Sequence, residues 1–270
     1  MNAKPAIPCA GLQVQGLVKH FGGVKAVQGV SFEVSPGECV AMIGPNGAGK
    51  STTFACIAGQ HAVTSGDVLW TGQSIAHLTP AQRLRAGITR TFQVAQTFDA
   101  LTVLQNVQLV LDVDKGFSAA QSLSQRAPHA AMSLLAEFGL QSDAHRHVLG
   151  LPYGLKKRLE LAIALAGISG LSAGAANPVA QPANSPLLLL DEPAAGLAAE
   201  ERLALMQTVK AQATQGVAVL YTEHNMDAIF GVADRVLVMI DGRIAAQGTP
   251  DAIARDSTVQ RRYLGLNFHA

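Results

Sequence analysis

The sequence predicts an α/β fold, and three observations lead to that prediction. Apolar runs typical of buried strands stand at Glu38–Ile43, Leu187–Leu190 and Val217–Thr222. Segments with helical character follow them, as at Ser51–Gly59 and Asn225–Ala233. This alternation is typical of a parallel sheet covered by helices. A chain of 270 residues, of which 49% are hydrophobic, is long enough to bury a large core around such a sheet.

A glycine-rich turn joins the first of these runs to the helix that follows it. The sequence GPNGAGKST at Gly44–Thr52 fits the pattern G-x-x-x-x-G-K-[ST], which is typical of a phosphate-binding loop. Its glycines let backbone N–H groups surround an anion, and the following helix directs the positive end of its dipole at the same point. We expect Lys50 to contact the terminal phosphates and the hydroxyl of Ser51 to bind Mg²⁺. The predicted nucleotide-binding residues of this loop are Gly44, Pro45, Asn46, Gly47, Ala48, Gly49, Lys50, Ser51 and Thr52.

Two further regions are predicted around this core. Polar and apolar residues alternate at Leu12–Val18, Val30–Val34 and Gly66–Trp70, which indicates half-buried strands and an N-terminal antiparallel β subdomain. Apolar residues have helical spacing within residues 92–166. We therefore expect a helical subdomain inserted into the α/β core.

The remaining segments complete one predicted domain over residues 1–270. Residues 167–185 are uncharged and rich in Gly, Ala and Pro, which predicts a flexible loop. The dipeptide Asp241-Gly242 between two apolar runs predicts a hairpin, and the C-terminal tail, residues 249–270, reads as helical. The nucleotide-binding core with its β subdomain is expected to comprise residues 1–91 and 186–248.

A second set of polar residues suits phosphoryl transfer. Asp191 and Glu192 follow an apolar strand, where the first can hold Mg²⁺ and the second can orient the attacking water. His224 follows the next strand, so we expect it at the same sheet edge, where it can contact the γ-phosphate. The side-chain oxygen of Gln93 can bind Mg²⁺ or one of its waters. An Asp-Glu pair after an apolar run is a weak signal alone, but a strong one downstream of a phosphate-binding loop.

Composition excludes several classes of protein. A formal net charge of +1 gives no support to charge-driven binding of nucleic acid. Three scattered cysteines indicate a reducing compartment without a disulfide framework. No apolar run approaches the roughly 18 residues that a spanning helix needs, and the N-terminus lacks a signal-peptide pattern. We therefore expect a cytosolic chain that acts at a membrane only through a partner.

Taken together, the motifs resemble the ATP-binding subunit of an ABC transporter. The resemblance rests on Gly44–Thr52, Thr91-Phe92-Gln93, Leu151–Glu160, Leu187–Glu192 and His224, in that order along the chain. It implies a RecA-like P-loop NTPase core, ATP and Mg²⁺ as cofactors, and Glu192, His224 and Lys50 as catalytic residues. It also implies that Phe21 stacks on adenine and that Ser51, Gln93 and Asp191 serve the metal.

The same resemblance implies partners. Members of the family dimerise head to tail, so that a signature segment of one subunit covers the ATP held by the other. That segment corresponds here to Leu151, Pro152, Tyr153, Gly154 and Leu155. The Gln93 loop and the helical subdomain are then expected to dock onto a transmembrane permease subunit.

A narrower resemblance is to the ATPases of branched-chain amino-acid importers, a group with close relatives for urea and amides. It rests on Gly22–Val34, Arg90–Gln93, Leu151–Gly154, Asp191–Leu197 and Arg262–Gly265. It implies a location on the inner face of the plasma membrane and, indirectly, a periplasmic solute-binding protein as a partner.

The chain departs from the usual family pattern at three positions. Pro152 replaces the signature serine, and Leu155 replaces the signature glutamine. Ala198 stands where the family commonly has an aspartate that communicates between subunits. Pro152 resembles what many branched-chain-type members carry, so we do not expect it to inactivate the site. The missing amide at Leu155 is expected to weaken the contact between subunits, and Ala198 removes the carboxylate through which they commonly communicate.

Three alternatives to branched-chain amino-acid import remain. The first is the ATPase of another ABC system, for urea or amide import or for export. The second is a weakly hydrolysing subunit that works with a different ATPase in a pair. The third, an ABC ATPase of translation or DNA repair, is disfavoured because those chains usually carry two nucleotide domains or long coiled coils. The transported solute is not encoded in this chain's motifs.

Overall fold

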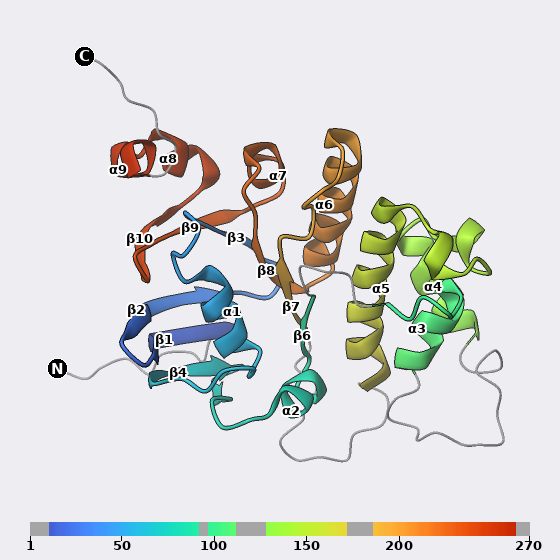
Figure 1. Ribbon diagram of the computed structural model, residues 1–270, viewed down its shortest axis with the longest axis horizontal. Helices are drawn as coiled ribbons and strands as arrows, with labels where there is room; N and C mark the ends of the chain where they lie inside the picture. The colour runs from blue at the N-terminus through green and yellow to red at the C-terminus, as the bar shows by residue number, and fades with distance from the viewer. Residues whose placement is uncertain (1–10, 92–96, 112–127, 172–185, 263–270) are drawn as a thin grey trace.

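The computed structural model describes residues 11–91, 97–111, 128–171 and 186–262, and these fold around two sheets (Figure 1). The first is antiparallel, with strand order β2-β1-β4-β5, and the second has the order β10-β9-β3-β8-β7-β6. The antiparallel sheet consists of β1 (Leu12–Phe21), β2 (Val24–Val34), β4 (Ser65–Trp70) and β5 (Gln73–Ser74). The second sheet consists of β3 (Cys39–Ile43), β6 (Ile88–Arg90), β7 (Leu187–Asp191), β8 (Ala218–Thr222), β9 (Arg235–Ile240) and β10 (Arg243–Gly248). The predicted α/β fold with an antiparallel β subdomain is confirmed.

The middle of the six-stranded sheet is parallel and fully buried. Strand β3 pairs in parallel with β8 and β9, and β7 pairs in parallel with β6 and β8. Every residue of β3, β7 and β8 is buried, which explains their continuous apolar sequences. The carboxyl ends of parallel strands meet at one sheet edge, so the segments after Ile43, Asp191 and Thr222 leave the sheet side by side.

Helix α1 (Lys50–Ile57) lies between the two sheets. Its residues Phe54 and Ile57 are fully buried in one cluster with Leu12 of β1 and Met42 of β3. The end of α1 is held by Arg83 from helix α2 (Pro80–Arg85), whose guanidinium donates to the carbonyl oxygens of Cys56 and Ile57 at 2.7 and 2.6 Å. These contacts satisfy carbonyls that every helix end leaves without a partner, and so fix the helix behind the glycine-rich loop.

The helical subdomain contains α3 (Val103–Leu111), α4 (Pro128–Glu137) and α5 (Tyr153–Leu171), with short 3₁₀ turns at Gln141–Asp143 and Val148–Gly150. Its predicted apolar faces pack together through Val107, Leu135 and Leu159, which are fully buried. Figure 1 shows these helices beside the sheet edge that carries β6.

The predicted boundary at Ala166 is wrong. Helix α5 continues to Leu171, although the loop was expected to begin at residue 167. Glycine costs a helix about 1 kcal/mol relative to alanine. A Cβ at Gly167 would stand 3.4 Å from Val110 and 3.6 Å from Leu84, which are ordinary van der Waals contacts, so packing does not require glycine there. The rest of the predicted loop, residues 172–185, lies outside the described residues.

The C-terminal part follows its prediction. Asp241 and Gly242, with φ angles of 50° and 75°, make the turn between β9 and β10. Helix α6 (Ala199–Thr214) precedes β8, and α7 (Met226–Phe230) is capped by the side chain of Asn225. The tail continues as α8 (Pro250–Arg255) and α9 (Ser257–Arg262), and residues 263–270 lie outside the described residues.

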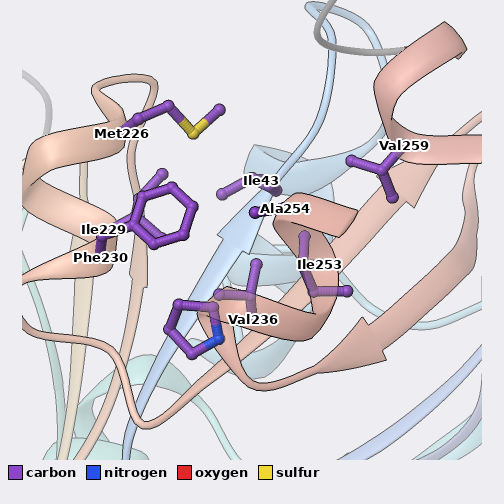
Figure 2. Close-up of a pocket in the computed structure, with 9 residues that line it drawn as sticks. Ile43, Met226, Ile229, Phe230, Val236, Ile253, Ala254 and Val259 are labelled. Carbon is purple, nitrogen blue, oxygen red and sulfur yellow. The ribbon is translucent and has the colours of Figure 1, made fainter. Parts of the chain in front are cut away.

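An apolar pocket lies where these last helices meet the sheet. Figure 2 shows side chains from α7, α8 and α9 surrounding Ile43 of β3 and Val236 of β9. It is lined by Ile43, Met226, Ile229, Phe230, Val236, Pro250, Ile253, Ala254 and Val259. Through these side chains the C-terminal tail packs against β3, the strand that leads directly into the glycine-rich loop.

Candidate nucleotide site

The glycine-rich loop connects Ile43 to α1 and leaves its middle open. Gly44 and Gly49 have φ angles of 148° and 99°, and a Cβ on either would meet the carbonyl oxygen of Met239 or Ala26 within 2.3 Å or less. Glycine is therefore required at these two positions. Gly47 also has a positive φ, 80°, but nothing lies within 4 Å of its missing Cβ. The loop thus packs tightly at both ends and exposes its backbone between them.

Lys50 is buried at the start of α1. Its ammonium group donates to the carbonyl oxygens of Gly44 at 2.6 Å and Pro45 at 3.0 Å, so it lies inside the loop. Burial lowers the pKa of Lys50, and the nearby carboxylates of Glu192 and Asp191 oppose that shift. The structure therefore brings the predicted phosphate-binding lysine and both predicted carboxylates together.

Asp191 ends β7 with each carboxylate oxygen engaged. The hydroxyl of Thr222 donates to Oδ1 at 2.9 Å, and the guanidinium of Arg90 donates to Oδ2 at 2.7 Å. Neither Thr222 nor Arg90 was predicted from the sequence as a partner of Asp191. Thr222 ends a predicted strand at the same sheet edge, which was an available signal. Arg90 gave no such signal, because it lies in β6, a strand of three residues that the sequence pattern did not predict.

Glu192 has a strained backbone and a short contact to His224. Its φ angle is 49°, an uncommon value for a residue other than glycine, and its N–H donates to the Thr222 hydroxyl at 2.9 Å. The carboxylate oxygen Oε1 lies 2.6 Å from His224 Nε2. Strain of this kind is concentrated at functional sites. The predicted proximity of the two side chains is thus present in a single chain.

The buried carboxylate of Glu223 holds the loops that carry these two residues. It accepts hydrogen bonds from the backbone N–H of Ala194 and of His224, each at 3.1 Å. One side chain therefore fixes both the segment after Glu192 and the start of the His224 loop. Sequence reasoning missed Glu223, because a carboxylate beside a histidine carries no distinctive pattern.

Phe21 ends β1 with 43% of its surface exposed. The ammonium of Lys19 lies 4.7 Å from the centre of its ring, and the ring of His61 meets it edge to face at 5.1 Å. An exposed aromatic ring with a cation and an imidazole around it is suited to stacking on a nucleobase. The other predicted nucleotide contact, Gln93, lies outside the described residues.

The signature segment stands apart from these residues. Tyr153 and Gly154 begin α5, and Figure 1 shows α5 on the side of the sheet away from α1. The ring of Tyr153 covers Gly196, where an added Cβ would stand 3.3 Å from the ring. Leu155 is partly buried and packs against the core. The segment therefore cannot reach the nucleotide loop of its own chain in this arrangement.

The residues present fit a Mg²⁺–nucleotide complex. The exposed hydroxyl of Ser51 and the carboxylate of Asp191 are oxygen donors of the kind that Mg²⁺ prefers. Within the described part of the chain, no three His, Cys, Asp or Glu side chains form a closed metal site. Such a sparse donor set suits Mg²⁺, which usually keeps waters and binds through substrate phosphates.

Comparison with known proteins decides the family. The sequence profile described as ABC transporter matches residues 27–171. The chain belongs to the ABC transporter family. It is a member of the ATP-hydrolysing cassettes of that family, with the P-loop core expected of them.

Several relatives of the cassette span nearly its whole length. It is 35% identical to the high-affinity branched-chain amino acid transport ATP-binding protein LivG of Escherichia coli K12, covering 94% of this chain and 97% of LivG. It is 33% identical to BraF of Pseudomonas aeruginosa, a protein of the same description, with the same coverage. It is 32% identical to LptB of Escherichia coli K12, a lipopolysaccharide export ATP-binding protein, covering 96% of this chain and 99% of LptB.

Solved structures agree with the fold. A nucleotide-free ATP-binding cassette from an ABC transporter superposes with a TM-score of 0.78 at 28% identity, covering 94% of this chain and 99% of that one. The ADP conformation of the cassette MJ1267 gives 0.77 at 29% identity, covering 94% and 98%. Among the described residues, no helix combines the length and the apolar character that crossing a bilayer requires.

Proposed function

We propose that this chain is the ATP-hydrolysing subunit of an importer for branched-chain amino acids. The observation that carries the proposal is the convergence of Lys50, Asp191, Glu192 and His224 at the carboxyl ends of β3, β7 and β8. The solute class rests on LivG and BraF, which match the chain over nearly their full length. LptB matches at a similar level, so export is the alternative that the experiment must separate.

In this proposal each residue of the site has one task. Lys50 supplies a cation at the mouth of the loop, where its bonds to two carbonyls give way to phosphate oxygens. Ser51, Asp191 and Gln93 would hold Mg²⁺, which would neutralise phosphate charge when bound. Glu192 takes a proton from the attacking water as it orients it. His224 contacts the γ-phosphate and, through its 2.6 Å contact, holds Glu192 in place.

The solute is tested by uptake. Deleting this chain in its host is expected to abolish uptake of radiolabelled leucine, isoleucine and valine at low external concentration. Uptake of labelled urea and amides should be unchanged. Loss of urea or amide uptake with normal leucine uptake would assign the chain to the related importer group, and normal uptake of all of them would contradict import.

One side of the site must come from a second subunit. Lys50, Asp191 and Glu192 lie in the core, whereas the signature segment Leu151–Leu155 leads into α5, which Figure 1 shows beyond the sheet edge that carries β6. We infer that a second ABC ATPase subunit, in a homodimer or a heterodimer, places its own signature segment over this ATP. The start of α5 would then direct its dipole at the γ-phosphate.

A heterodimer is the second candidate arrangement, and the signature segment favours it. Pro152 has no hydroxyl or N–H to donate, and Leu155 has no side-chain amide. If this chain's signature is weak, its own homodimer should hydrolyse ATP roughly tenfold more slowly than the pair formed with a second cassette. Comparing phosphate release by the purified chain with that of the co-expressed pair tests this. Equal rates would favour the homodimer.

The helical subdomain offers a surface for a membrane partner. Phe98 is 58% exposed and Leu149 is 74% exposed, and the N–H of Leu149 donates to the carbonyl of neighbouring Asp99. The side chain of the fully buried Asn106 accepts from the Phe98 N–H at 2.8 Å and donates to its carbonyl at 3.1 Å. Rigidly held apolar side chains at a surface are typical of interaction sites. We infer that a transmembrane permease docks here, which would place the chain in the cytoplasm, on the inner face of the plasma membrane. A periplasmic solute-binding protein would be an indirect partner.

This surface gives a testable result. Replacing Phe98 with serine should lower the amount of permease that co-purifies with the cassette by roughly tenfold or more, as for a central apolar contact. The basal ATPase rate of the separated chain should stay unchanged. Leu203→Ser, on α6 and 45% exposed before the change, is the matched control and should not weaken the complex. Equal losses in both variants would contradict a specific docking surface.

A further inference from the structure

We propose that Arg90 is a positioning residue that neutralises Asp191 while the site lacks Mg²⁺ and releases it when Mg²⁺ and nucleotide bind. The proposal rests on the proposed function, because it assigns Asp191 to the metal. It adds a residue of β6 to the site and connects the metal to the hollow between the core and the helical subdomain.

The geometry of this ion pair is well defined. Arg90 Nη2 lies 2.7 Å from Asp191 Oδ2, and each side chain is only 11% exposed. The other terminal nitrogen of Arg90 donates to the side chain of Gln60, which follows α1. The Thr222 hydroxyl holds the opposite oxygen of Asp191. The carboxylate therefore keeps its orientation through Thr222 even without the guanidinium.

Electrostatics gives the direction of the effect. A carboxylate with little solvent around it requires a positive partner, and Arg90 supplies one in the metal-free chain. A divalent cation drawn to the same carboxylate has to approach that guanidinium, and two like charges at short distance repel each other. The Arg90–Asp191 pair therefore opposes Mg²⁺ binding, and removing the charge of Arg90 should make the metal bind more tightly.

The position of Arg90 connects the metal to a second region. Arg90 belongs to the lining of a hollow of about 210 Å³ between the core and helices α3 and α5, together with Thr91 and Glu160. Glu160 is an acidic group of α5, ion-paired with Lys157 at 3.2 Å. If Asp191 binds Mg²⁺ and releases Arg90, the guanidinium of Arg90 lies beside a hollow that also contains the carboxylate of Glu160.

The first experiment measures metal affinity without catalysis. Fluorescent N-methylanthraniloyl-ADP is bound to the full chain in EDTA, and Mg²⁺ is then titrated. We expect Arg90→Met and Arg90→Gln to lower the Mg²⁺ midpoint roughly tenfold, since both remove the charge. Glutamine keeps a hydrogen-bond donor near Asp191, so it serves if the methionine variant does not fold. Arg90→Lys keeps the charge and should therefore stay closer to the unchanged chain than either uncharged variant does.

The outcomes separate this proposal from the proposed function. An unchanged or higher Mg²⁺ midpoint in the uncharged variants would overturn the role of Arg90. Lys50→Ala serves as the reference for the site itself. Normal nucleotide binding in that variant would contradict the proposed site, whatever Arg90 does.

A second measurement tests the connection to the hollow. Hydrogen exchange of Ile88–Thr91 should differ between the ADP-bound chain with Mg²⁺ and the ADP-bound chain in EDTA. The difference should be absent in Arg90→Gln, because no charge is then released from Asp191. The same difference in both proteins would show that the metal acts on β6 by another route, and would overturn the proposed link.

Discussion

Replacing Glu192 with glutamine should lower ATP turnover by roughly a hundredfold or more, the usual loss when a general base is removed. The substitution keeps the size of the side chain and one oxygen beside His224, whose Nε2 lies 2.6 Å from the carboxylate. It removes the charge that accepts the proton of the attacking water. Phosphate release measures the rate, and equilibrium titration should show ATP binding within about threefold of the original affinity.

A matched control separates catalysis from folding. Glu200 is also a glutamate, it follows Glu192 closely in the sequence, and it is exposed in the first turn of α6. Glu200→Gln should leave turnover unchanged. Because ATP would no longer be consumed, Glu192→Gln with Mg²⁺ and ATP should also accumulate as a dimer in analytical ultracentrifugation. Full ATPase activity in Glu192→Gln would exclude the assigned role.

Replacing Lys50 with alanine should weaken ATP binding by roughly thirtyfold or more, the loss expected when one partner of a buried charge contact is removed. The ammonium group lies in the loop between the carbonyls of Gly44 and Pro45 and near the two carboxylates. Without it, the phosphates face Asp191 and Glu192 with no lysine cation between them. Thermal unfolding with increasing ATP measures the effect, because a ligand that binds only the folded state stabilises it by RT ln(1 + [ATP]/Kd).

The control for this variant is Lys25→Ala, a change at an exposed lysine of β2. It should keep the full stabilisation by ATP. Comparison in the absence of nucleotide shows how much of the change is structural, since Lys50 also bonds to its own loop. A Lys50→Ala variant stabilised by ATP as strongly as the original chain would contradict the site.

The sequence could predict the elements with local signals. The strands β3, β7 and β8 are continuous apolar runs because both faces of the sheet are covered, and α2 starts at a Thr79 capping box. Phosphate-loop chemistry is local as well, so Gly44–Thr52 was identifiable without a structure. Strand β6 is too short for periodicity, and the last turns of α5 contain glycines, which predict a loop rather than a helix.

The polar contacts of the site join residues that lie far apart in the sequence. Thr222 reaches Asp191 across adjacent strands, and Arg90 reaches it from the edge of the sheet. No spacing in the sequence encodes either contact, because their positions are set by strand order. The positive φ of Glu192 is likewise a property of the folded chain.

The most direct test is a structure of Glu192→Gln bound to Mg²⁺ and ATP, in complex with the second ATPase subunit and the permease. We expect ATP to lie between Lys50 of this chain and the signature segment of the other ATPase subunit. We also expect Leu151–Leu155 of this chain to cover the second nucleotide. An ATP held by this chain alone, with the other subunit's signature segment remote from it, would contradict a nucleotide site shared between two subunits.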